Sequence, residues 1–250
     1  MKVFATYNIK GGVGKTASAV NLAYQSSIQG YRTLLWDLDP QGAATFYFRL
    51  EPKLQGGAKK LARGKLDLDD LIRGTDFEGL DLLPADFSLR HFDIALGDVK
   101  KSSGQLARLL GPLEERYDHL FIDCAPSISA VSESVFVASD ALLVPSIPTT
   151  LSRRTLEQLE EHLDKKSRRR VRVLPFFCMV DRRRSLHRQI LEESHTWPFD
   201  PLEAEIPYST WVEQMGAHRA PVAVFAHRSA PALAYAQLWQ EIGERLAASD

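Results

Sequence analysis

Two lysines, a threonine and three glycines stand close together near the start of the chain, over residues 10 to 16. Glycines at such a spacing let backbone N–H groups turn toward a bound anion. Lys15 supplies a positive charge at the β- and γ-phosphates, and the Thr16 hydroxyl is suited to ligate magnesium. The spacing therefore predicts a loop that holds the phosphates of ATP together with Mg²⁺.

Two further segments place carboxylates after apolar runs. Asp37 and Asp39 follow one such run, and Pro40 and Gly42 then turn the chain sharply. A carboxylate in this position can face the γ-phosphate or its attacking water, although an Asx-rich turn after a strand is also common. Asp123 ends a second apolar run, the pattern in which a carboxylate holds magnesium. The predicted metal ligands are Thr16, Asp39 and Asp123.

The order of elements explains how these residues would meet. We predict strands at residues 3–7, 33–38, 80–83, 119–123, 141–145 and within 171–180. Helices are predicted at residues 16–29, 105–116, 129–138, 155–165, 184–193 and 232–248. This alternation implies an α/β fold of the P-loop NTPase type, with a doubly wound, mostly parallel sheet covered by helices on both faces. Ligands bind at the carboxyl ends of such strands. A chain of 250 residues fits a single domain over residues 1–250.

The charge and the cysteine content exclude several classes of protein. The net charge is −1, which excludes a generic polyanion binder, yet residues 151–190 hold twelve Lys or Arg against five Asp or Glu. Cys124 and Cys178 lie in apolar surroundings with no zinc-like or disulfide spacing. No signal peptide precedes the first strand, and no apolar run is long enough to span a membrane. These features favour a cytoplasmic protein.

Several stretches resemble one family. Residues 8–16, Asn-Ile-Lys-Gly-Gly-Val-Gly-Lys-Thr, resemble the deviant Walker A motif of the ParA/MinD family of ATPases. Residues 37–42 resemble its D-x-D-P-Q-G motif, and residues 123–127 its D-x-P-P region, with Ala125 replacing the first proline. Similarity continues at residues 139–145, 206–208 and 220–222, and so covers nearly the whole chain.

The resemblance implies roles for particular residues. Lys10 would reach across a homodimer formed on ATP binding and touch the partner subunit's nucleotide, and Asp39 would position or activate the hydrolytic water. The implied catalytic residues are Lys10, Lys15 and Asp39. The implied nucleotide contacts are Lys10, Gly11, Gly12, Val13, Gly14, Lys15, Thr16, Ala17, Asp123 and Pro207. Cys178 stands where the family usually has an asparagine that contacts adenine, so base recognition would pass to backbone groups near Pro207.

Members of this superfamily use the ATPase cycle for different functions. Residues 244–250 lack the basic amphipathic tail of a membrane-bound MinD-type regulator. The two cysteines do not suit the iron–sulfur cluster of a nitrogenase-type reductase. We therefore expect ATP-dependent, sequence-independent DNA binding through Arg153, Arg154, Arg182, Arg183 and Arg184, with Lys165, Lys166 and residues 168–170 in a basic connector.

A small ParA-like partition ATPase is accordingly the leading hypothesis. It would associate with the nucleoid, and a ParB-like or other cargo-adaptor protein would stimulate its hydrolysis. The cargo could be a plasmid, a chromosome or a protein assembly. The basic residues could instead form a solvated charged face. The alternative is therefore a regulator that acts through a protein partner without DNA, as a cellulose-synthesis or pilus-associated ATPase would.

Overall fold

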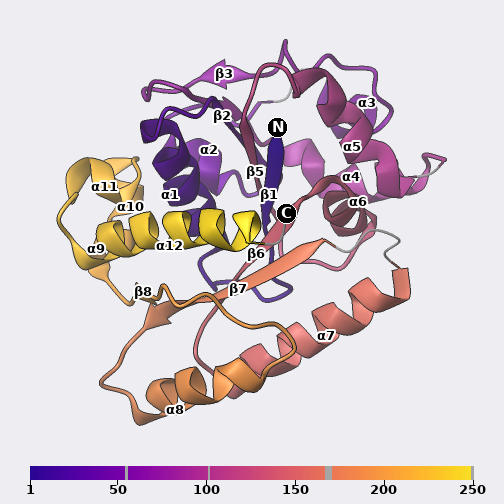
Figure 1. The fold of residues 1–250 in the computed structure, drawn as a ribbon. Coiled ribbons are helices and arrows are strands. Elements are labelled where there is room, and N and C mark those ends of the chain that lie inside the picture. The colour runs from indigo at the N-terminus through magenta and orange to yellow at the C-terminus, as the bar shows by residue number, and fades with distance from the viewer. Residues whose placement is uncertain (54–55, 101, 167–170, 249–250) are drawn as a thin grey trace.

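A twisted, mostly parallel sheet forms the centre of the molecule (Figure 1). The computed structural model describes residues 1–53, 56–100, 102–166 and 171–248. Within these residues eight strands follow the order β3-β4-β2-β5-β1-β6-β7-β8, and only β3 runs antiparallel to its neighbour. The strands are β1 (Lys2–Thr6), β2 (Thr33–Asp37), β3 (Arg73–Gly74), β4 (Leu80–Leu83), β5 (His119–Asp123), β6 (Ala141–Ser146), β7 (Arg172–Val180) and β8 (Ile206–Pro207).

Helices connect the strands on both sides of the sheet. The longer ones are α1 (Lys15–Ile28), α6 (Ala130–Ala138), α7 (Thr150–Lys166), α8 (Ser185–Glu193) and α12 (Ala230–Ala247). The shorter ones are α2 (Ala43–Tyr47), α3 (Gly57–Ala62), α4 (Phe92–Gly97), α5 (Gln105–Leu110), α9 (Thr210–Glu213), α10 (Met215–His218) and α11 (Val222–Phe225). Among the described residues, no helix is long and apolar enough to cross a membrane.

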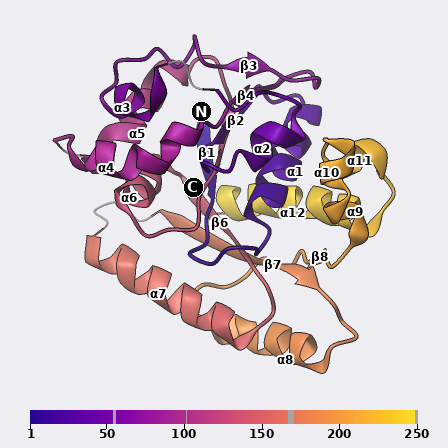
Figure 2. The same ribbon diagram turned by 180° about the vertical axis from the view of Figure 1, so that it is seen from behind.

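Side-chain alternation along the strands builds two separate cores. In β1, Val3 and Ala5 join one hydrophobic cluster, whereas Phe4 between them joins the other. Helices α1 and α12 cover the face of Phe4, and α5, α6 and α7 pack against the opposite face (Figures 1 and 2). The expected doubly wound α/β fold, with helices on both faces, is therefore confirmed.

Three sequence-based element predictions were wrong in detail. The helix expected over residues 105–116 ends at Leu110, because Gly111 and Pro112 begin a 3₁₀ turn instead. The helix expected from residue 155 already begins at Thr150, where Ser152 Oγ donates a hydrogen bond to the Ile147 carbonyl. That helix runs on to Lys166, so Lys165 and Lys166 belong to its last turn and not to a connector. Residues 168–170 lie outside the described residues.

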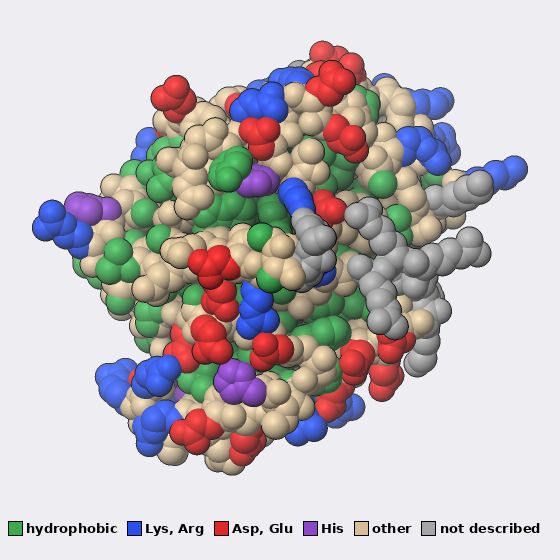
Figure 3. Space-filling view, viewed as in Figure 1, with side chains coloured by type: hydrophobic (Ala, Val, Ile, Leu, Met, Phe, Trp, Pro, Cys, Tyr) green, Lys and Arg blue, Asp and Glu red, His purple; other side chains and the backbone are tan. Residues whose placement is uncertain are grey.

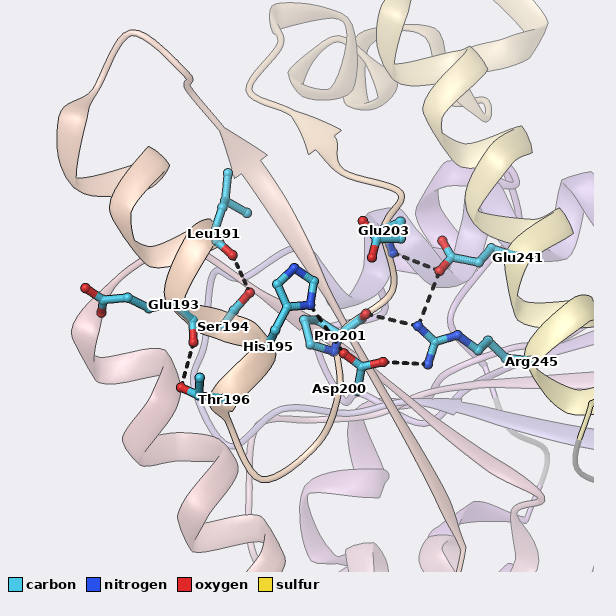
Figure 4. A network of polar contacts seen from close by, with 10 residues as sticks. All are labelled: Leu191, Glu193, Ser194, His195, Thr196, Asp200, Pro201, Glu203, Glu241 and Arg245. Carbon is cyan, nitrogen blue, oxygen red and sulfur yellow. Dashed lines mark hydrogen bonds and ion pairs between the residues drawn. The ribbon is translucent and has the colours of Figure 1, made fainter.

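A polar network fastens the segment before β8 to helix α12 (Figure 4). The Glu241 carboxylate accepts hydrogen bonds from the backbone N–H groups of Glu203 and Ala204, at 2.8 and 2.9 Å. Arg245, one turn further along α12, pairs with Asp200 at 3.1 Å. This network fixes where the chain enters β8, the strand that carries Pro207.

His119 is packed among aromatic rings at the amino-terminal edge of the sheet. Its ring centroid lies 4.3 Å from that of Tyr31 and 5.3 Å from that of Trp239, and its Nδ1 lies 2.8 Å from Ser26 Oγ. Burial lowers the pKa of His119 to about 4. In the unfolded chain the imidazole titrates near its ordinary pKa of about 6.5. Between these values only the unfolded state binds the proton, so this residue's contribution to stability is lost as the pH falls.

We predict that His119→Asn flattens the pH dependence of stability between about pH 6.5 and pH 4. Urea unfolding at several pH values measures this, with the exposed His227→Asn as the matched control. The wild type and the control should lose stability over this window more steeply than His119→Asn does. Equal slopes for all three proteins would contradict the assignment.

Candidate nucleotide site

The loop between β1 and α1 has the backbone shape that a phosphate loop requires. Gly12 and Gly14 adopt φ angles of 72° and 94°, a left-handed region open to glycine without strain. Gly14 caps α1, so the free N–H groups and the positive dipole end of that helix point into the loop. Gly11 and Gly12 are exposed, and a Cβ added at either would meet open space. The loop is therefore accessible to an anion.

Asn8 fastens the entrance of this loop to the sheet. Its side-chain Nδ2 donates to the Pro145 carbonyl of β6 at 2.9 Å, and its Oδ1 accepts from the Lys10 backbone N–H at 2.8 Å. The side chain is buried, with 3% exposure. One amide thus links the phosphate loop to the neighbouring strand.

The two lysines of the loop occupy different positions. Lys15 is buried, and its ammonium donates to the Lys10 carbonyl across the loop at 3.1 Å. Burial lowers the pKa of Lys15, while the nearby Asp123 carboxylate opposes that change. The Lys10 side chain is half-buried and forms no ion pair within the described part of the chain. Lys15 is therefore held inside the loop, whereas the Lys10 side chain pairs with no carboxylate among the described residues.

Asp37 and Asp123 lie side by side at the carboxyl ends of β2 and β5. The two residues are register partners, and Asp123 is also paired in register with Thr6 of β1. Both aspartates have 0% exposure. The sheet thus brings two carboxylates together directly beneath the phosphate loop.

Each of these aspartates keeps one buried oxygen without a hydrogen-bond partner, Oδ1 of Asp37 and Oδ2 of Asp123. Burial raises the pKa of both carboxyl groups, and the charge of Asp37 adds to the rise at Asp123. A hydrogen bond from the Thr16 side chain acts in the opposite direction at Asp123. Buried, unpartnered carboxylate oxygens are suited to a hard cation or its water ligands.

The donor set fits magnesium in particular. Among the described residues, no group of three or more His, Cys, Asp or Glu side chains is arranged to hold a metal. Mg²⁺ usually binds one or two carboxylates and completes its shell with water and phosphate oxygens. Thr16 and Asp123, with Asp37 behind them, match this requirement.

Asp39 lies in the turn that follows β2. Its Oδ1 accepts from the Gln41 N–H at 2.9 Å, and its carbonyl accepts from the Gly42 N–H at 2.9 Å. The residue is half-buried, and its charge acts on both Lys15 and Asp123. The structure therefore brings together Lys15, Asp39 and Asp123, and the assignment of water positioning to Asp39 stays a prediction.

Pro207 borders a pocket of about 320 Å³ at the same edge of the sheet, between the ends of β7 and β8. Asp181, Tyr208 and Glu205 contribute to its lining. Cys178 does not reach this pocket. It has 2% exposure and packs under the phosphate loop, where its Sγ would be 3.5 Å from a Cβ built on Gly14. The Cys178 side chain thus supports the loop and is not placed to read a base beside Pro207.

The five candidate DNA-binding arginines lie at one end of α7 and before α8. Lys and Arg side chains gather at the corner formed by the loop between β7 and α8 (Figure 3). Three of the five arginines form ion pairs: Arg153 with Glu157, Arg182 with Glu205 and Arg183 with Asp181. Arg154 and Arg184 are exposed and form no ion pair within the described residues. Arg184 precedes α8 as its N-cap residue and does not lie in the helix.

Lys165 and Lys166 stand apart from this corner. They end α7, a 17-residue helix, and a helix of that length extends about 25 Å. The backbone positions of these two lysines therefore lie at the opposite end of α7 from Arg153 and Arg154.

Sequence reasoning missed several residues that shape the site. Asp37 was passed over for Asp39, although it ends a buried strand in the same way as Asp123 and that shared pattern could have identified it. Thr6 and Thr45, which contact the two buried carboxylates, had no recognisable signal, because their roles depend on strand register and on a short helix.

The geometry defines a class of protein: a P-loop nucleotide-binding fold with two buried aspartates at the ends of neighbouring strands. Residues 1–173 match a family model described as "AAA domain". The sporulation initiation inhibitor protein Soj of Bacillus subtilis is 30% identical over 250 residues, covering 96% of this chain and 98% of Soj. The chromosome partitioning protein ParA of Caulobacter vibrioides is also 30% identical, covering 98% of this chain and 95% of ParA.

Solved structures agree with these relatives. Cobyrinic acid a,c-diamide synthase from Mycobacterium smegmatis, solved with bound ADP and magnesium, superimposes with a TM-score of 0.84 at 25% identity, over 100% of this chain and 97% of that one. The chain therefore belongs to the ParA/MinD family of P-loop ATPases.

We predict that Asn8→Ala weakens binding of a fluorescent ATP analogue, because the Lys10 N–H and the Pro145 carbonyl lose their common partner. A hydrogen bond of this kind contributes about 1 kcal/mol. Asn8→Ala removes two of them, and water partly replaces both, so we expect the Kd to rise roughly five- to tenfold. Asn21→Ala, a second buried asparagine in α1, is the control for general destabilisation. An unchanged Kd for Asn8→Ala would show that Asn8 has no role in shaping the loop.

Proposed function

We propose that this chain is an ATP-driven switch that binds ATP with Mg²⁺, closes into a homodimer and binds DNA without sequence preference in that state. All 250 residues would act as one P-loop ATPase domain. The observation that carries the proposal is the contrast between the two lysines of one phosphate loop. Lys15 is buried within the loop, while the Lys10 side chain has no carboxylate partner among the described residues.

The nucleotide contacts follow from the loop. Backbone N–H groups of residues 11–17 and the Lys15 ammonium would hold the phosphates, and Thr16 and Asp123 would hold the metal. Bound magnesium would neutralise charge on the β- and γ-phosphates. Asp39, half-buried beside Lys15, would orient the attacking water, with its own oxygens as a further metal contact through water. Backbone groups near Pro207 would contact the base, since Cys178 is buried under the loop.

Lys10 is proposed to act on the nucleotide of a second copy of the chain. We predict that Lys10→Ala still binds ATP but loses ATP-dependent dimerisation and partner-stimulated hydrolysis. Light scattering with ATP and with ADP measures the first loss, and phosphate release measures the second. Lys2→Ala, an exposed lysine at the opposite edge of the sheet, is the matched control. If Lys10→Ala dimerises like the wild type, Lys10 does not act on the nucleotide of a second copy, and the loop is an ordinary P-loop.

The arginines before α8 and at the start of α7 support DNA binding. Surface ion pairs such as Arg182 with Glu205 contribute little free energy, so phosphate groups can compete for these guanidinium groups. Arg154 and Arg184 have no such competitor within the described residues. Neutralisation of phosphates by these side chains would give salt-dependent binding without base readout. The relatives Soj and ParA, named for sporulation control and chromosome partitioning, fit this output.

We predict that Arg154→Ala/Arg184→Ala weakens ATP-dependent binding to arbitrary duplex DNA. The slope of log K against log salt should become shallower by about one for each phosphate that the variant no longer neutralises. Lys59→Ala/Lys60→Ala removes two charges from the exposed surface of α3 and is the control. Fluorescence anisotropy at several salt concentrations, with ATP and with ADP, measures binding. Equal DNA binding with ATP and with ADP, or no DNA binding at low salt, would refute ATP-dependent DNA binding as the function.

A ParB-like or other cargo-adaptor protein would stimulate hydrolysis and so release the dimer from the nucleoid. The cargo would be a plasmid, a chromosome or a protein assembly. The same ATPase mechanism could move any of the three. The ion pairing of Arg153, Arg182 and Arg183 favours one competing function, a regulator that acts through a protein partner without DNA. Loss of DNA binding at low salt combined with retained ATP-dependent dimerisation would select that function.

A further inference from the structure

Thr45, in the short helix α2, contacts the buried carboxylate of Asp37 twice. Its backbone N–H and its hydroxyl both donate to Asp37 Oδ2, each at 2.7 Å. Thr45 is itself fully buried, with 0% exposure. Both donors of one residue are thus directed at one oxygen of the aspartate, and the other oxygen, Oδ1, is left without a partner.

The direction of the hydroxyl bond is set by a third contact. The Ala85 backbone N–H donates to Thr45 Oγ1 at 2.9 Å, so the hydroxyl oxygen is already an acceptor and its single proton is available for Asp37. Thr45 therefore joins three segments: the end of β2, helix α2 and the stretch after β4. The Asp37 carboxylate cannot rotate without breaking this connection.

The fixed orientation matters because of what lies beside it. Asp37 and Asp123 are register partners on adjacent strands, and each has one unpartnered buried oxygen. Residues behind a metal ligand commonly fix its geometry, and their loss typically lowers metal affinity or activity about 10- to 100-fold. Thr45 has the position and the hydrogen bonds for such a role.

We infer that Thr45 is a positioning residue for the magnesium side of the site. By clamping Asp37 Oδ2 it keeps the second oxygen of Asp37 beside Asp123, and it ties cation binding to helix α2. This inference rests on the proposed binding of ATP with Mg²⁺ and adds to it a link between that event and helix α2, whose Phe46 side chain is exposed.

Helix α2 carries the connection outward to helix α10. The Phe46 carbonyl, next to Thr45, accepts from Arg219 Nε at 2.9 Å, and the Arg219 guanidinium lies over the Phe46 ring at 4.6 Å. Arg49, just after α2, donates to the His218 carbonyl at 3.2 Å. A change at the cation would therefore reach α10 through the Thr45 hydrogen bonds to Asp37, the backbone of α2, and the contacts of Phe46 and Arg49 with residues 218 and 219.

The test measures how much Mg²⁺ is needed for tight binding of a fluorescent, non-hydrolysable ATP analogue. Thr45→Val removes the hydroxyl and keeps the shape, and Thr45→Ser keeps the hydroxyl. We expect Thr45→Val to raise the half-saturating Mg²⁺ concentration about tenfold and Thr45→Ser to leave it near the wild-type value. Binding of the analogue in EDTA should be the same in all three proteins.

Thr33→Val is the matched control, since it makes the same chemical change in a buried threonine at the other end of β2. An unchanged Mg²⁺ requirement in Thr45→Val would overturn the inference. So would an equal loss of binding in EDTA, because that result would indicate general damage to the loop.

A measurement on the wild type covers the case in which Thr45→Val does not fold. Hydrogen exchange of residues 43–49 and 215–219 should slow with analogue and Mg²⁺ relative to analogue and EDTA. No difference in exchange would contradict the link through α2. None of these experiments contains DNA, so a failure of this inference is separate from a failure of the proposed DNA-binding function.

Discussion

Burial of a carboxylate removes its water and is unfavourable unless other groups replace those hydrogen bonds. This protein buries two of them, Asp37 and Asp123, at neighbouring positions in the sheet. Thr6 and Thr16 contact one and Thr45 contacts the other, yet one oxygen of each is left unpartnered. The proposed Mg²⁺ or its water ligands would supply partners for these two oxygens. Much of the surrounding architecture can be understood as the support for this pair.

A parallel sheet is what makes such a pair possible. Strands covered by helices on both faces consist of apolar residues, so polar groups are confined to the strand ends. In this chain β1, β2 and β5 all end at one edge, and the phosphate loop, the turn at Asp39 and the pocket beside Pro207 lie along that edge. The amino-terminal edge has the opposite character, with the aromatic packing around His119. The candidate site residues therefore lie at one edge of the sheet, and the aromatic packing around His119 lies at the other.

The sequence was most informative where local rules act alone. A glycine-rich loop between a strand and a helix is recognisable because backbone conformation and residue type are directly linked. Six strands were located to within one or two residues from their apolar runs, whereas the two-residue strands β3 and β8 were not predicted. Helix α2 was not found, because five residues are too few for periodicity and its formation depends on contacts such as that of Thr45 with Asp37.

Pairings between distant residues were equally inaccessible. Arg182 is neutralised by Glu205, 23 positions away, and the connection is created only by the approach of β8 to β7. A count of charges along the chain therefore overstated the free positive charge at this corner. The position of Cys178 is a similar case. Its resemblance to the family motif placed it at the base end of the pocket, but in the structure its side chain packs under Gly14.

The contact between Cys178 and the phosphate loop has an evolutionary consequence. A hypothetical Cβ on Gly14 would already be at van der Waals distance from the sulfur, so the two positions share one small volume. No change at position 14 could make room for a bulkier side chain at position 178, because position 14 is already glycine. A longer side chain at position 178, such as the asparagine usual in the family, would therefore have to turn away from Gly14 or displace the loop.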